Sequence, residues 1–143
     1  MRRQRAKVKE SVAFLERETE LRPEIAIVLG TGLGGLADKI KAAAVIPYEK
    51  IPNFPISTVA SHEGRLIFGS LGGKTVVAKQ GRFHFYEGYE PKDITFPIRV
   101  MVAMGIKTLL ISNAAGGLDL SFQAGDLMLI SDHINLTGQN PLR

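Results

Sequence analysis

Hydrophobic positions follow a helical spacing at the start of the chain and form unbroken runs further along it. Within residues 7–21, apolar side chains recur at i, i+4 and i+7 among charged residues, which predicts an amphipathic helix that Pro23 ends. The aliphatic run of residues 25–29 predicts a buried strand, because it leads directly into the glycine-rich residues 30–35. A short helix is predicted next, over residues 36–44.

The middle of the chain has the composition of a β-hairpin. The apolar-rich residues 65–71 and 74–80 are separated by Gly72 and Gly73, which suit a two-residue turn. Prolines interrupt residues 47–55, which are therefore expected to be irregular. The sequence thus predicts two antiparallel strands after an irregular segment.

Helical and strand patterns continue after the hairpin. Residues 81–89 form an aromatic-rich loop, and residues 91–104 predict a helix. Residues 107–112 predict a strand, and residues 127–130 predict a third buried strand that continues extended through residues 132–136.

This alternation indicates an α/β fold with a mixed, largely parallel central sheet flanked by helices. Residues 1–143 are expected to form a single domain, because no linker or internal repeat interrupts them. No helical pattern follows residues 91–104, although such a sheet needs cover on both faces. We therefore expect a truncated domain, or one that needs a partner to cover its sheet.

Composition and charge exclude several classes of protein. The 45% hydrophobic and 22% charged residues are ordinary for a globular domain, and the absence of cysteine excludes disulfides and thiolate metal sites. The net charge of +4 lies within residues 1–10, a basic N-terminal arm, and the rest of the chain is balanced. No apolar run approaches the roughly 18 residues of a membrane span. We expect a cytoplasmic protein that binds neither nucleic acid nor membrane.

The glycine-rich segment is the first candidate binding site. Gly30, Gly32 and Gly35 match the letters of the dinucleotide fingerprint, but Glu49, at the expected acidic position, lies in a proline-broken loop. Backbone N–H groups and the Thr31 hydroxyl would instead form a nest suited to phosphate. A tight turn without a ligand is the structural alternative.

Arg82, His84 and Tyr86 are the sharpest local cluster, because their spacing by two places them on one side of an extended backbone. The arginine fork can bind a phosphate through two hydrogen bonds, His84 can add a third, and Tyr86 offers a ring and a hydroxyl. The alternative is that aromatic neighbours such as Phe83 pack in the core while Arg82 reaches solvent.

Two further segments carry candidate ligand contacts. His62 lies in a polar cluster that precedes a predicted strand, and residues 113–117 leave a predicted strand at its carboxyl end, where open α/β sheets place ligands. Either segment is also compatible with a purely structural role. No two of the three histidines have metal-ligand spacing, so no metal site is predicted.

Four sequence blocks in order closely resemble the trimeric class of purine nucleoside phosphorylases. They are GTGLGGLADKI (residues 30–40), SHEGRLIFG (61–69), QGRFHFYEGY (80–89), and NAAGGL followed by GDLMLISDHINLTGQNPL (within 113–142). The resemblance runs from about Val8 onward and matches only the N-terminal half of a family member. It implies the family's mixed α/β fold, a homotrimer, and phosphorolysis of purine ribonucleosides and deoxyribonucleosides to free base and (deoxy)ribose 1-phosphate. In this pentosyl transfer inorganic phosphate is a substrate, and no cofactor is expected.

The resemblance also implies roles for individual residues. Phosphate contacts are implied for Thr31, His62, Arg82, His84 and the backbone N–H of Ala114, with His84 as the catalytic residue. A ribose contact is implied for Tyr86, and four residues are expected to line the site: Gly32, Phe83, Asn113 and Ala115. The family's base-binding residues belong to its second half, so this chain is expected to supply the phosphate site and part of the ribose site. The alternative function is a non-catalytic anion-binding or interaction module.

Overall fold

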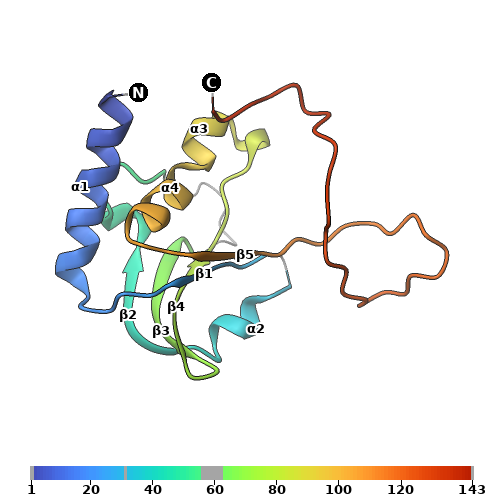
Figure 1. Ribbon diagram of the computed structural model, residues 1–143, viewed down its shortest axis with the longest axis horizontal. Coiled ribbons are helices and arrows are strands. Elements are labelled where there is room, and N and C mark those ends of the chain that lie inside the picture. The colour runs from blue at the N-terminus through green and yellow to red at the C-terminus, as the bar shows by residue number, and fades with distance from the viewer. Residues whose placement is uncertain (1, 31, 56–62, 143) are drawn as a thin grey trace.

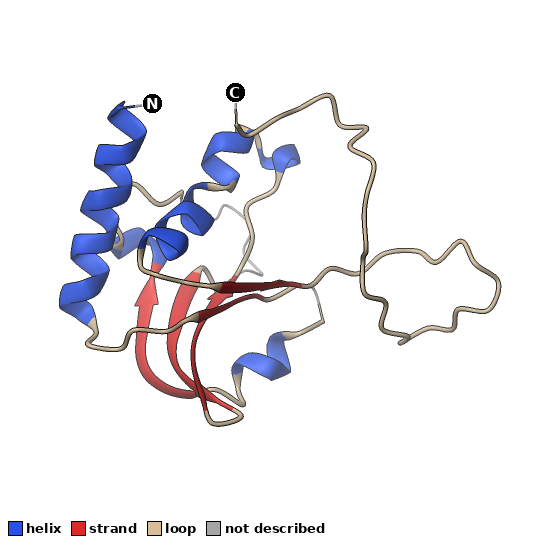
Figure 2. Ribbon diagram, in the orientation of Figure 1, coloured by secondary structure: helices blue, strands red, loops and turns tan. Residues whose placement is uncertain are grey.

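The computed structural model describes residues 2–30, 32–55 and 63–142. A five-stranded sheet in the order β2-β3-β4-β1-β5 forms its centre, with helices on both faces (Figures 1 and 2). The strands are β1 (Ile25–Val28), β2 (Lys41–Pro47), β3 (Arg65–Leu71), β4 (Lys74–Gln80) and β5 (Thr108–Ile111). The helices are α1 (Arg2–Glu18), α2 (Gly34–Ala37), α3 (Pro91–Ile94) and α4 (Phe96–Ala103), with 3-10 turns η1 (Tyr48–Lys50) and η2 (Phe85–Glu87).

The sheet is mixed, as the sequence predicts. β3 and β4 form the predicted hairpin with the predicted bounds, and β2 pairs antiparallel with β3. β1 lies between β4 and β5 and runs parallel to both. The carboxyl ends of β4, β1 and β5 therefore lie side by side at one edge of the sheet.

Side chains that alternate along the strands form two hydrophobic cores. Leu66 and Phe68 of β3 belong to the larger core, which also contains Leu15 of α1 and Val100 of α4. Ile67, between them in the chain, belongs to the smaller core on the opposite face, under α2. Figure 1 shows α1, α3 and α4 on one side of the sheet and α2 on the other.

The helices differ from the prediction in their bounds. α1 begins at Arg2 instead of residue 7 and ends at Glu18, so the basic residues among the first ten lie on the helix. Arginine and lysine favour helices, and their charged ends remain in solvent while Leu15 anchors the helix in the core. The helix predicted for residues 91–104 divides into α3 and α4 at Thr95, whose hydroxyl donates to the Pro91 carbonyl at 2.9 Å.

Two predicted elements are wrong. The helix predicted over residues 36–44 ends at Ala37, and the alanine-rich segment after it forms β2. Pairing with β3 overrides helix propensity here, and it depends on Gly69, where a Cβ atom would overlap the Lys41 carbonyl. The strand predicted for residues 127–130 has no strand partner in the part of the chain described, and its Leu127 and Leu129 are almost fully exposed. An apolar run forms a strand only where a neighbouring strand can pair with it.

The segment after β5 leaves the sheet as a long extended loop and returns towards α3, as Figure 1 shows. There the Arg99 Nη2 donates to the Pro141 carbonyl at 3.0 Å. None of the described helices is both long and apolar enough to cross a bilayer.

Candidate active site

Three loops meet where β1, β4 and β5 end. The Gly30 N–H, after β1, donates to the Ser112 Oγ, after β5, at 3.2 Å. The Ser112 hydroxyl in turn donates to the Val28 carbonyl at 3.2 Å. Arg82, in the loop after β4, donates from Nε to the Leu29 carbonyl at 3.3 Å. The predicted phosphate loop and the predicted arginine are thus brought together at the edge where open α/β sheets bind ligands.

Gly30 is required by this close approach. A Cβ atom at this position would lie 2.6 Å from the Ser112 carbonyl oxygen and 3.1 Å from the Arg82 Nη2. The first contact is with backbone, so it could not be relieved by a side-chain rotation. The glycine therefore lets the β1 and β5 loops and the arginine pack at the sheet edge.

The Arg82 guanidinium is half-buried and only partly satisfied. Its Nη2 is buried and has no hydrogen-bond partner among the residues that the structure describes. Burial lowers the pKa of Arg82 from its usual value, but a guanidinium remains charged at any physiological pH. A cationic N–H group that is already buried can donate to an anion at little further desolvation cost.

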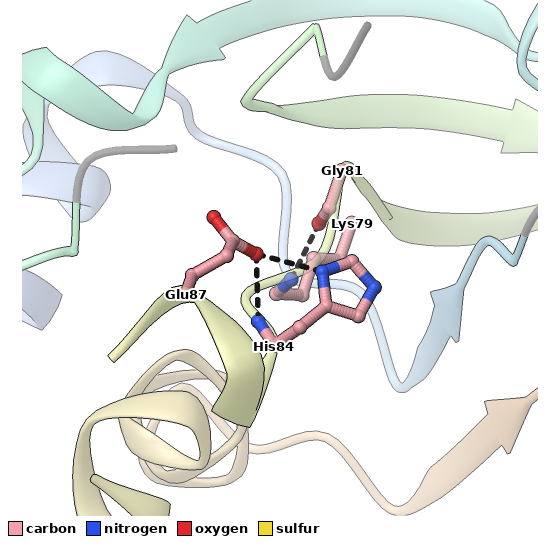
Figure 3. Close-up of polar contacts among 4 residues, drawn as sticks. All are labelled: Lys79, Gly81, His84 and Glu87. Carbon is pink, nitrogen blue, oxygen red and sulfur yellow. Dashed lines mark hydrogen bonds and ion pairs between the residues drawn. The ribbon is translucent and has the colours of Figure 1, made fainter. Parts of the chain in front are cut away.

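His84 is held by a carboxylate. Its Nδ1 lies 2.7 Å from the Glu87 Oε1, which also accepts the His84 backbone N–H at 2.9 Å (Figure 3). The Glu87 side chain is only 3% exposed. Because a carboxylate accepts hydrogen bonds, this contact places a proton on Nδ1 and leaves Nε2 as the ring nitrogen that faces away from Glu87. Sequence reasoning missed Glu87, although a glutamate three residues after a capping position is a recognisable signal.

The two aromatic residues on either side of His84 have different environments. Tyr86 is 77% exposed, and its ring stacks on the His84 imidazole with centroids 4.7 Å apart. Phe83 was expected to line the site, but it is buried in the larger core, 5.3 Å from the Tyr48 ring and 5.6 Å from the Tyr89 ring. Phe83 thus anchors the loop from behind, and Tyr86 remains on its open side.

Lys79 lies behind the same loop and was also missed. It is 3% exposed, and its Nζ donates to the Gly81 carbonyl at 2.5 Å. Burial, and then the charge of Arg82, lower the pKa of Lys79 to about 7, against a smaller opposing effect of Glu87. A lysine that directly follows the apolar residues 76–78 of the predicted strand, at a position that alternation places on the same face as Val77, was the signal available in the sequence.

The other candidate residues lie in exposed loops after β1 and β5 or outside the described residues. Gly32 has a left-handed backbone with φ of 85° and is exposed. Asn113, Ala114 and Ala115 are exposed in the loop that follows β5. Thr31 and His62 lie outside the described residues.

The geometry does not support a dinucleotide site or a metal centre. Glu49 lies in the 3-10 turn η1. In the described sheet, the strand after the glycine loop, β2, pairs with β3 at the edge and is separated from β1 by both β3 and β4. The dinucleotide fold instead requires a second parallel strand with an acidic end. No group of three or more metal-ligating side chains gathers within the described ranges.

The fold and this edge define an α/β protein with cationic side chains gathered at the ends of its parallel strands, which is a candidate ligand site. The family model described as the phosphorylase superfamily matches residues 24–143, and the chain belongs to this superfamily. The resemblance noted in the four sequence blocks is thereby confirmed.

Individual relatives within this superfamily are named as purine nucleoside phosphorylases. The chain is 54% identical over 138 residues to purine nucleoside phosphorylase 1 of Geobacillus stearothermophilus, covering 96% of this chain and 50% of the relative. It is 54% identical over 133 residues to the Mus musculus purine nucleoside phosphorylase, covering 91% and 46%. A crystal structure of isoform 2 of the Schistosoma mansoni enzyme, in complex with cytosine and ribose-1-phosphate, matches with a TM-score of 0.79 at 45% identity, covering 85% and 42%. The chain thus spans about half the length of the curated relatives it matches.

Proposed function

We propose that the protein catalyses phosphorolysis of purine ribonucleosides and deoxyribonucleosides to free purine base and ribose or deoxyribose 1-phosphate. This chain supplies the phosphate site and part of the ribose site. The observation that carries the proposal is the buried, incompletely bonded Arg82 guanidinium beside the Gly30 backbone. Relatives named as purine nucleoside phosphorylases give the substrate class.

In the proposed reaction, phosphate is the nucleophile. Arg82 binds it through its guanidinium, and the Thr31 hydroxyl, His62 and the Ala114 N–H complete the shell, as the resemblance implies. His84, with its Nδ1 proton directed to Glu87, accepts the phosphate O–H at Nε2 and so keeps the nucleophile in its more anionic form. Phosphate then attacks the anomeric carbon as the glycosidic bond breaks through an oxocarbenium-like transition state, and the base leaves with the bonding electron pair.

Tyr86 is assigned to the ribose. Its exposed ring stacks on His84, so a sugar placed above the phosphate would contact the phenol and its hydroxyl. Gly32, Asn113 and Ala115, from the neighbouring loops, line the same edge in this proposal.

The assembly proposed is the homotrimer implied by the resemblance to the trimeric class. Light scattering on the purified protein measures its mass, and a monomer or dimer would contradict the trimer. The cytoplasmic location stays a prediction.

The test of the activity is phosphate-dependent release of hypoxanthine from inosine, with ribose 1-phosphate measured as the second product. Equal amounts of the two products, with no release when phosphate is omitted, support phosphorolysis. Release of free ribose would instead identify a hydrolase. Lys74→Met serves as the control for variants of the site and should keep the activity, because Lys74 is exposed at the end of β4 far from Arg82.

A second candidate function is a non-catalytic anion-binding module. The observation that favours it is the incompletely bonded Arg82 guanidinium, which would bind an anion whether or not a nucleoside binds as well. Phosphate binding by calorimetry without any product from inosine, guanosine or adenosine would support this function over the first.

A further inference from the structure

A lysine ammonium lies in an aromatic environment behind the candidate phosphate site. Lys79 belongs to the β4 face that packs into the larger core, and its Nζ lies 4.6 Å from the Phe83 ring centroid and 5.3 Å from the Tyr48 ring centroid. Both rings can stabilise a cation through their faces. They do not replace the hydration of an ammonium, so a buried lysine without a carboxylate partner is costly to charge.

The groups around Lys79 leave an excess of positive charge. Arg82, from the loop after β4, repels its ammonium, and Glu87, from η2, attracts it. The Glu87 carboxylate is shared with His84, and Lys79 forms no ion pair in the described part of the chain. The Tyr48 hydroxyl, from η1, is neutral, because burial raises its pKa above the ordinary range.

Lys79 also holds the peptide that directs Arg82 to the site. Its Nζ and the Tyr48 hydroxyl both donate to the Gly81 carbonyl, at 2.5 Å and 3.0 Å (Figure 3 shows the lysine contact). Gly81 has φ of 100° and turns the chain out of β4, and Arg82 follows directly. A substitution of Lys79 would leave the tyrosine contact in place, so the turn would keep one of its two donors.

We propose that Lys79 is a positioning residue of the anion site, whose buried ammonium fixes the Gly81–Arg82 peptide, adds its charge to that of Arg82 and takes up a proton when a dianion binds. The proposal rests on the proposed function, which places an anion at Arg82. With a pKa of about 7, Lys79 is largely neutral in the free protein at alkaline pH. A dianion nearby favours the charged form, so binding above pH 7 draws in a proton and weakens as the pH rises.

The experiment uses sulfate as the probe, because its charge does not change across the range in which Lys79 titrates. Calorimetry in two buffers of different ionisation enthalpy gives both the affinity and the number of protons taken up. The informative variant is Lys79→Met, since methionine keeps the contacts with the two rings and removes the charge. Lys74→Met, an exposed position on the same strand, is the matched control.

We expect the unmodified protein and Lys74→Met to bind sulfate on the order of tenfold more weakly at alkaline than at acidic pH, with proton uptake around neutrality. Lys79→Met should bind sulfate weakly at every pH, and it should take up fewer protons on binding than the unmodified protein. An unchanged pH profile and proton count in Lys79→Met would overturn the proposal.

Two measurements keep the outcome interpretable. If Lys79→Met does not fold, NMR of the unmodified protein labelled at the lysine ε-carbons replaces it, since ordinary lysines titrate only near pH 10.4. A lysine signal that titrates near neutral pH and shifts with sulfate supports the proposal, and the absence of such a signal refutes it. Because sulfate binding needs no nucleoside, Lys79-dependent binding without inosine phosphorolysis would refute the proposed function alone.

Discussion

Replacing Arg82 by methionine should weaken phosphate binding without destabilising the free protein. Among the described residues, the side chain makes one hydrogen bond, from Nε to the Leu29 carbonyl, and its loss costs about 1 kcal/mol. The substitution also removes the buried Nη2, which lacks a partner in the described residues. Removing this group stabilises the folded protein by about 1–3 kcal/mol, because its desolvation penalty disappears. The second effect is at least as large as the first, so the free energy of unfolding should stay unchanged or rise by up to about 2 kcal/mol.

The same variant should lose about 2 kcal/mol or more of phosphate binding, which is roughly a 30-fold rise in the phosphate KM with little change in the nucleoside KM. Urea denaturation with and without phosphate separates the two effects. At a phosphate concentration of a hundred times Kd, the unmodified protein should gain about 2.7 kcal/mol and Arg82→Met much less. A variant destabilised by several kcal/mol without phosphate, or stabilised equally by phosphate, would refute this account of Arg82.

Three further predictions follow from the same contacts. Glu87→Gln should lower kcat roughly tenfold or more with a smaller effect on the nucleoside KM, because the neutral amide no longer sets the His84 tautomer; an unchanged kcat and pH–rate profile would contradict this. Gly30→Ala should destabilise the protein by about 1–3 kcal/mol in urea denaturation, because its Cβ would meet the Ser112 carbonyl oxygen at 2.6 Å. Lys79 binds a proton more weakly in the folded protein than in the unfolded chain. The free energy of unfolding should therefore rise between about pH 7 and the unfolded pKa of 10.5, by up to about 1.4 kcal/mol per pH unit. Lys79→Met should remove this rise in a series of urea denaturations.

Local chemistry determines the elements that the sequence predicts well. Gly72 and Gly73 both have positive φ, as a tight hairpin turn requires, and this turn delimits β3 and β4 at their predicted ends. The aliphatic runs of β1 and β5 are similarly recognisable, because strands with parallel neighbours on the sheet need apolar side chains on consecutive positions.

The elements that were predicted wrongly depend on distant residues. The alanine-rich residues 42–44 favour a helix locally, and they form a strand because Gly69 allows β2 to approach β3. The apolar residues 127–130 have the composition of a strand and no strand to pair with in the described part of the chain. Pattern alone cannot reveal either circumstance, since both depend on which segments meet in the fold.

Some residues of the candidate site were found from sequence, and others were missed. Arg82 and His84 were found from sequence because their spacing by two places them on one side of an extended segment and because their side chains suit a phosphate. Glu87 and Lys79 were missed because their roles require the 3-10 turn that brings the carboxylate back to His84 and the strand alternation that turns the lysine inward. The residues that we propose to contact the ligand are thus easier to find from sequence than those that orient them.

The two cationic side chains at this edge, Arg82 and Lys79, affect each other electrostatically. The Arg82 guanidinium is half-buried, and its buried Nη2 has no partner among the described residues. Lys79 is buried nearby with Glu87 as an opposing charge, so the folded protein carries an electrostatic cost at the end of β4. A bound dianion would relieve that cost at both residues, which makes the cost in the free protein part of the affinity for the anion. The retained stability of Arg82→Met, its weakened phosphate binding and the rise of stability as Lys79 deprotonates are therefore three consequences of the same charge placement.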